Sequence, residues 1–268
     1  MPDGTNLIYQ YDGSFDGLLC CVFESYLKKE FPADILPPDA PQATLFPVRE
    51  IETDSEKARR VLVSIPKKMG GEALDFVRRA FLTCAPQKER NILLFLRLGY
   101  RVGPRVLDML TNDTVDTLQK AVRHLNNEAH LLKGFLRFSD FNGALAAEIE
   151  PKNSVLPLLV QHFCERYPEE RFLIYDRTHA SALIYQPYKP IILPVEDFQM
   201  PEPDEEERSF RELWRLFYKT IEIEGRHNPR CRMSHMPKRY WKEMTEFAQG
   251  TKSQFTLEER KRDSLRKL

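Results

Sequence analysis

The chain has 268 residues, with 40 Lys or Arg and 40 Asp or Glu, so its formal net charge is zero. This balance excludes a coat protein that is basic throughout and an acidic disordered chain, so any site for a polyanion must be a local patch. No apolar run is long enough to cross a membrane, no signal-peptide pattern opens the chain, and five cysteines are too sparse for a disulfide framework. We therefore expect a cytoplasmic protein that does not contact membranes.

The chain is expected to open with a strand and a helix. Residues 7–11 alternate as a strand does, Asp12-Gly13-Ser14 predicts a turn and a helix cap, and residues 16–29 carry one apolar stripe. The segment 32–47 holds five prolines, which are incompatible with a central strand or a helix interior, so we predict a surface loop there.

Further helices are predicted to follow a short strand at 48–52. Thr53-Asp54 is a suitable cap for the first of them, and the expected breaks lie at Gly70-Gly71, Pro86 and Gly103-Pro104. The clearest helix covers residues 114–133, because its apolar positions recur every three or four residues. Gly134 is the expected end of this helix.

The pattern then changes to that of strands. Asn142-Gly143 predicts a hairpin between strands at 135–138 and 144–150, since this dipeptide suits a tight turn. A helix is expected at 155–167. Two more strands are predicted at 172–175 and 182–186.

These elements predict an α+β fold that is mostly helical, with a small antiparallel sheet. We expect a single domain over residues 1–250, with an acidic linker at 196–207 and then an amphipathic helix at 209–222. Residues 251–268 are expected to form a charged tail.

The segment 225–242 carries the strongest local charge, with six Lys or Arg and no acidic residue. Basic residues hold phosphates and exposed aromatic rings stack on bases, so this segment is a candidate nucleic-acid interface. Its candidate residues are Arg226, Arg230, Arg239, Tyr240, Trp241 and Lys242. Alternatively, the two aromatic residues lie in the core and the charges face water.

Asn228 and Pro229 fit the cap and first residue of a helix, while Arg226 could bind an anion or pair with a carboxylate. Arg137 could likewise bind a phosphate or pair with Glu148 or Glu150.

The catalytic candidates are His162, Arg166 and Asp176, because a His–Asp pair can perform general acid–base chemistry. A buried polar network that fixes a helix to a sheet is the alternative that we favour. His227, Cys231 and His235 are spaced by four, but prolines interrupt that helix, so we expect no metal. No motif indicates a cofactor.

Several of these motifs together resemble those of one bacterial family, and the match runs in order from about residue 7 to 247. The motifs are Tyr11-Asp12-Gly13-Ser14-Phe15-Asp16-Gly17, Glu128-Ala129-His130, Lys133-Gly134-Phe135-Leu136-Arg137-Phe138, Pro151, His162-Phe163-x-x-Arg166, Ile174-Tyr175-Asp176-Arg177, Trp214, Arg226-x-Asn228-Pro229 and Met236-Pro237-x-Arg239-Tyr240-Trp241-Lys242.

That family is assigned to DNA metabolism or DNA repair, its biochemistry is unknown, and it occurs beside a predicted radical-SAM DNA-modification or repair protein. Related domains are fused ahead of uracil-DNA glycosylase-like domains. The present sequence lacks the cysteine triad of a radical-SAM enzyme and the characteristic loops of a glycosylase. The resemblance therefore implies an accessory protein that binds DNA and works with a radical-SAM partner. An enzyme acting on a nucleobase or phosphodiester, and an adaptor that docks an acidic protein, are the alternatives.

Overall fold

The computed structural model describes residues 5–38, 45–196, 198–223, 225 and 228–247. The chain divides into two compact units, where the sequence led us to expect one domain. Unit 1 comprises residues 1–128 and 152–155, and unit 2 comprises 129–151 and 156–268. The fold is α+β and 53% helical, which confirms the expected class and the helical majority. The expected charged tail at 251–268 lies outside the described residues.

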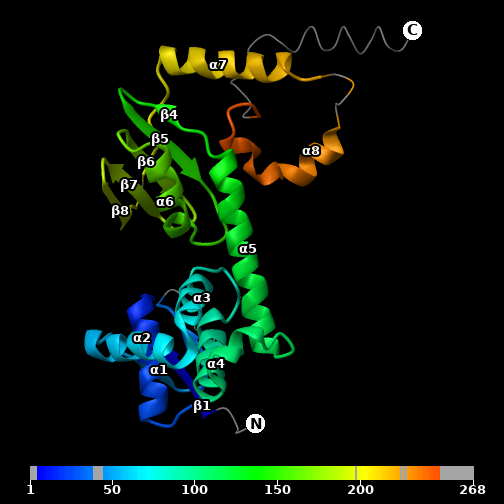
Figure 1. Cartoon of the computed structure of the whole chain (residues 1–268). Coiled ribbons are helices and arrows are strands. Elements are labelled where there is room, and N and C mark those ends of the chain that lie inside the picture. The colour runs from blue at the N-terminus through cyan, green and yellow to red at the C-terminus, as the bar shows by residue number, and fades with distance from the viewer. Residues whose placement is uncertain (1–4, 39–44, 197, 224, 226–227, 248–268) are drawn as a thin grey trace. The chain divides into compact units, whose positions relative to one another are not determined.

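Unit 1 is built on a three-stranded parallel sheet of order β2-β1-β3, of which Figure 1 labels β1. Its strands are β1 (Thr5–Gln10), β2 (Pro32–Leu36) and β3 (Val48–Glu50). Its helices are α1 (Phe15–Leu27), α2 (Ser55–Met69), α3 (Gly71–Phe81), α4 (Lys88–Val102) and the 3-10 helix η1 (Gly103–Asp108). Buried side chains from the strands and helices, such as Tyr9, Leu18, Ile65 and Phe95, form one core.

The structure of unit 1 bears on two predicted helix caps and on one predicted loop. The side chain of Ser14 caps α1 by accepting from Gly17 N–H, and that of Asp54 caps α2, so both predicted caps are confirmed. The predicted Pro-rich loop is wrong at its start, because β2 occupies residues 32–36. Pro32 is tolerated there because it is the first residue of an edge strand, where no N–H is required.

Unit 2 contains a mixed five-stranded sheet of order β4-β5-β6-β7-β8. Its strands are β4 (Ser139–Asp140), β5 (Ala144–Ile149), β6 (Arg171–Asp176), β7 (Ser181–Gln186) and β8 (Lys189–Pro194). β5 and β6 are parallel and the other pairs antiparallel, so the predicted small antiparallel sheet is wrong for both units. α6 (Leu156–Arg166) connects β5 to β6 and contacts the sheet, as a crossover helix must.

β8 forms an edge of this sheet, and its prolines limit pairing with another strand. Val195 N–H donates to the Ala180 carbonyl at 2.8 Å. In an antiparallel pair, the backbone N–H groups of every second residue point to the neighbouring strand, so those of residues 189, 191 and 193 point toward β7. Pro190, Ile192 and Pro194 consequently face the open edge. Two of these three residues have no N–H to donate, which protects the edge from strand addition.

α5 (Asp113–Phe135) contributes residues to both units and runs two residues beyond the predicted end. Phe135 is therefore helical, and the predicted strand at 135–138 is wrong, although β4 and β5 do flank Asn142-Gly143. The remaining elements of unit 2 are α7 (Glu205–Thr220), α8 (Pro229–His235) and the 3-10 helix η3 (Lys238–Glu243).

α7 begins inside the predicted acidic linker 196–207. Asp204 caps it by accepting from Glu207 N–H, and the acidic residues that follow fill its first turn, where they interact favourably with the helix dipole. In the part of the chain that the structure describes, no helix has both the length and the apolar character needed to span a bilayer.

Candidate functional site

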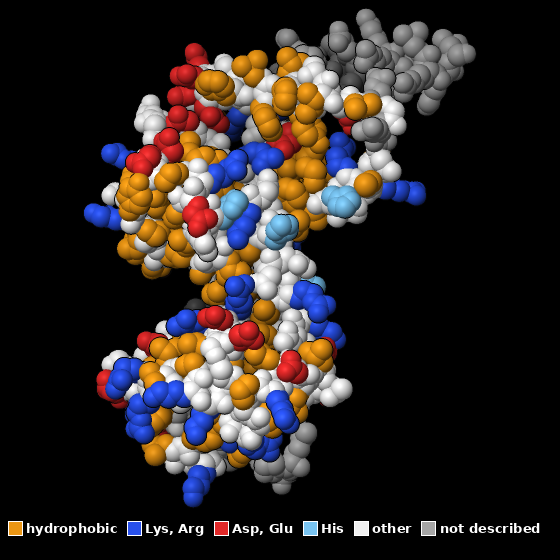
Figure 2. All heavy atoms as spheres, viewed as in Figure 1, with side chains coloured by type: hydrophobic (Ala, Val, Ile, Leu, Met, Phe, Trp, Pro, Cys, Tyr) orange, Lys and Arg blue, Asp and Glu red, His pale blue; other side chains and the backbone are white. Residues whose placement is uncertain are grey.

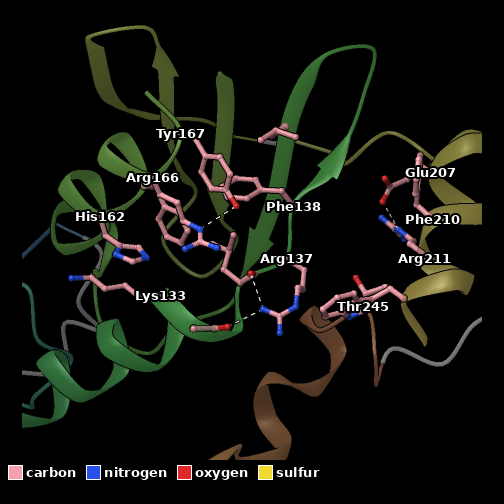
Figure 3. A pocket seen from close by; sticks show the side chains of 15 residues that line it. Lys133, Arg137, Phe138, His162, Arg166, Tyr167, Glu207, Phe210, Arg211 and Thr245 are labelled. Atoms are coloured by element: carbon pink, nitrogen blue, oxygen red, sulfur yellow. Dashed lines mark hydrogen bonds and ion pairs between the residues drawn. The ribbon is translucent and has the colours of Figure 1, made fainter. Parts of the chain in front are cut away.

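A pocket of about 710 Å³ opens in unit 2 between the end of α5, α6 and α7 (Figure 3). Its volume is in the range of small-molecule sites. The basic side chains that line it are Lys133, Arg137, His162, Arg166 and Arg211. The aromatic side chains that line it are Phe138, Phe163, Tyr167, Phe210 and Trp214. A single acidic residue, Glu207, is among the lining residues.

The basic residues differ in whether a carboxylate already neutralises them. Arg211 pairs with Glu207 at 2.7 Å, and Arg137 pairs with Glu246 at 2.7 Å. Lys133, His162 and Arg166 form no ion pair with any residue that the structure describes. We call these three residues the cationic corner; Figure 3 shows them close together, on the opposite side of the pocket from α7.

Helical spacing produces the cationic corner. His162 and Arg166 are four residues apart on α6 and so share a face, and Lys133 comes from the last turns of α5. Burial lowers the pKa of His162, and the positive charges of Lys133 and Arg166 lower it further. The imidazole is therefore neutral at neutral pH, and it forms a hydrogen bond with the Lys133 backbone.

Aromatic rings line the pocket both beside the corner and opposite it. The Phe138 ring contacts those of Phe163 and Tyr167, with centroids 5.5 Å apart in each case. Across the pocket, Phe210 is 60% exposed and Trp214 is 40% exposed. Figure 2 shows Lys, Arg and His side chains beside hydrophobic ones on this face of unit 2. Such a surface can bind an anion and stack a planar ring at the same time.

Arg137 is held in a structural role at the edge of the pocket. Its guanidinium donates to the carbonyls of Gly134 and Leu136, which lie at the end of α5, and to Glu246. The Glu246 side chain is only 2% exposed and also accepts from Trp214 Nε1 at 3.1 Å. Arg137 thus joins the end of α5 to the segment after η3. The predicted pairing of Arg137 with Glu148 or Glu150 is wrong.

The pattern of the DUF4130 family, described as a domain of unknown function, matches residues 86–246. The chain belongs to the DUF4130 family. Every residue that lines the pocket lies within the matched region. Comparison with proteins of curated function found no match.

The structure places two of the three catalytic candidates of this DUF4130 protein in the pocket. His162 and Arg166 line it, but Asp176 does not. Asp176 lies at the end of β6 with its side chain 1% exposed, and its carboxylate accepts from His179 N–H and lies 2.7 Å from His179 Nδ1. Asp176 therefore does not pair with His162, either catalytically or in the buried network that we favoured, because His179 in the turn after β6 binds the carboxylate.

The basic segment of the DUF4130 protein forms α8 and η3. Asn228 caps α8 by accepting from Cys231 N–H at 3.0 Å, and Pro229 begins the helix, so this prediction is confirmed. Tyr240 is 3% exposed and packs against Phe135, so its ring is not available to stack on a base. Arg226, and His227 of the considered metal triad, lie outside the described residues.

The other candidates of this segment are more exposed, but most have intramolecular contacts. Arg239 lies over the Tyr240 ring, and Lys242 pairs with Glu150. Trp241 stacks on Phe247, with centroids 4.7 Å apart, and donates to the Met236 carbonyl. Arg230 is exposed.

Sequence reasoning missed Lys133, Arg211, Phe210 and Trp214 as members of a site. Lys133 is the last residue of the predicted helix 114–133, and its position near the end of α5 could have indicated that it belongs to a site. Nothing local connects α7 to α6, because about 40 residues and three strands separate them. His179 was also missed, although its spacing from Asp176 fits a turn closed by a side chain.

Proposed function

We propose that this DUF4130 protein binds nucleic acid in the pocket of unit 2, as an accessory protein of DNA repair or DNA modification. The observation that carries the proposal is the cationic corner, three basic groups that lie beside aromatic rings and form no ion pair with a carboxylate of the described residues. A phosphate would interact with the corner while its base contacts Phe138, Tyr167 or the α7 aromatics. Phosphate contacts supply most of the affinity, and each stacked base contributes about 1–3 kcal/mol.

Lys and Arg of the basic segment would add contacts to the nucleic-acid backbone outside the pocket. Arg230 and Arg239 are exposed and belong to α8 and η3, in the same unit as the pocket. The proposed role in repair or modification, and the radical-SAM protein as partner, rest on the resemblance of the sequence motifs. A direct test of the partner is sedimentation of the two purified proteins, alone and mixed.

Fluorescence anisotropy of labelled single-stranded and duplex DNA, measured at several salt concentrations, tests the proposed binding. We expect a linear decrease of log affinity with log salt, and a shallower slope for Lys133→Ala/Arg166→Ala. Arg171→Ala/Lys189→Ala is the matched control, because both residues are exposed in unit 2 and neither lines the pocket. A flat salt dependence, or equal loss in both double variants, would contradict binding in the pocket.

The enzyme alternative is favoured by the position of His162 in the pocket, where burial and two nearby positive charges lower its pKa. A neutral imidazole can accept a proton from water or from a nucleobase. Product analysis after incubation with DNA substrates, using His162→Gln as the control, tests this alternative. The adaptor alternative predicts binding to an acidic protein and a flat salt curve with DNA.

A further inference from the structure

We infer that the group held by the cationic corner is a phosphomonoester, as found at the end of a nucleic-acid strand or in a free nucleotide. This inference rests on the proposed function and adds to it the chemical class of the anchoring group. It is drawn from the number of cationic groups at one place, the absence of an ion pair between them and any carboxylate in the described part of the chain, and the space beside them.

The corner offers more positive charge than a single phosphodiester can neutralise. Lys133 and Arg166 supply two cationic side chains, and protonated His162 would add a third. A phosphodiester inside a strand carries one negative charge and two free oxygens, whereas a phosphomonoester carries up to two charges and three acceptor oxygens. The monoester therefore matches the corner in both charge and hydrogen-bonding groups.

The surroundings of the corner suit the rest of a nucleotide. The pocket volume of about 710 Å³ is sufficient for one nucleotide, and Tyr167 and Phe138 lie next to Arg166. Glu207 across the pocket is already engaged by Arg211 and by the backbone N–H of Asp140. Its negative charge is thus compensated by the protein itself, and among the described residues no carboxylate forms an ion pair with the cationic corner.

Binding of a dianion would also change the protonation of His162. The charged groups that face His162 are Lys133 from α5 and Arg166 and Glu165 from α6, while the Arg211–Glu207 pair lies on α7 across the pocket. Burial lowers the pKa of His162 most, the two cations lower it further, and a bound dianion would raise it. We therefore expect proton uptake on binding near pH 7.5, and affinity that rises as the pH falls from about 8 to about 6.5.

The experiment compares otherwise identical labelled oligonucleotides with a 5′-phosphate, a 3′-phosphate or no terminal phosphate, together with deoxyadenosine monophosphate and deoxyadenosine. Calorimetry at pH 7.5 in buffers of different ionisation enthalpy measures the proton uptake. We expect the phosphomonoester to strengthen binding at least about tenfold, a gain that is lost in Lys133→Ala/Arg166→Ala and kept in Arg171→Ala/Lys189→Ala. His162→Gln should bind without proton uptake.

The outcomes separate failure of the phosphomonoester inference from failure of the proposed nucleic-acid binding. Equal, pocket-dependent binding of phosphorylated and unphosphorylated strands would overturn the phosphomonoester and leave the proposed function in place. Absence of binding to every nucleic-acid probe would overturn both. Tighter binding of the phosphorylated strand than of the mononucleotide identifies the strand end as the source, and the reverse order identifies a free nucleotide.

Discussion

Unit 2 contains two basic regions, and they differ in how their charges are arranged. The segment of α8 and η3 concentrates its charges in the sequence, whereas the cationic corner combines residues from two separate helices. In the segment, Lys242 pairs with Glu150 and Tyr240 is buried against Phe135. In the corner, no carboxylate of the described chain pairs with Lys133 or Arg166.

Charge density along a sequence does not reveal which cations the protein already neutralises by its own ion pairs. An ion pair within the protein must be broken or shared before either partner can bind an external phosphate, and this reduces the gain. Unpaired cations beside aromatic rings can bind a phosphate without that cost. The corner is therefore expected to contribute more to nucleic-acid affinity than the segment does.

Charge reversal gives the largest expected effect and tests this ranking directly. Lys133→Glu/Arg166→Glu should weaken binding of a phosphorylated single strand by about 100-fold or more, because each lost charge-assisted contact is worth about 1.5–3 kcal/mol. Arg230→Glu/Arg239→Glu should weaken it by about tenfold. Anisotropy titrations at one fixed salt concentration measure both. If the second variant loses more affinity than the first, the segment is the main interface and the ranking is wrong.

The next largest effect is a loss of stability on replacing Arg137, which we assign a structural role and not a role in binding. Arg137→Ala removes the partner of a carboxylate that is almost fully buried, Glu246, and should reduce the free energy of unfolding by about 2 kcal/mol or more. Chemical denaturation followed by tryptophan fluorescence measures the loss. Arg137→Ala/Glu246→Gln is the control, because it removes both charges and should recover part of the stability. An unchanged midpoint for Arg137→Ala would show that Glu246 has no need of this partner.

The features that the sequence predicted correctly depend on hydrogen bonds and backbone angles within a few residues. Ser14, Asp54 and Asn228 were recognisable as caps because each side chain binds an N–H within three residues. Asn142-Gly143 predicted the hairpin because both residues adopt positive φ, 55° and 81°, which the turn requires. The helical spacing of His162 and Arg166 placed both on one face of α6.

The features that the sequence did not predict depend on contacts between segments that are far apart in the chain. β1 pairs in parallel with β2 and β3, and β5 pairs in parallel with β6, and each parallel pair requires a crossover whose partner strand no local signal identifies. Asp176 was considered as a partner of His162 because a helix that packs on the following strand could bring the two together, yet the turn after β6 brings His179 closer. The α7 wall of the pocket depends on the packing of the whole unit.

A smaller effect is expected from the pKa of His162. Because its pKa in the folded protein lies below the ordinary value of 6.5, the unfolded chain binds the proton more readily, and stability should fall as the pH decreases below about 6.5. The loss should be under about 1 kcal/mol because the ring is partly exposed. His162→Gln should abolish this contribution, which thermal melts at pH 7.5 and pH 5.5 can detect. An identical pH dependence in the variant would mean that other groups cause it.

The smallest expected effect is that of Lys242→Ala. Lys242 pairs with Glu150, but its side chain is 55% exposed and Glu150 also contacts Arg177, so the loss of stability should be within about 0.5 kcal/mol. Affinity for a single strand should fall by no more than about threefold, because Lys242 is already engaged within the protein. Glu150→Gln is the informative counterpart: it releases Lys242 and should strengthen binding slightly. A tenfold loss in Lys242→Ala would instead show that the lysine leaves Glu150 to contact a phosphate, and the contrast between the two basic regions would then disappear.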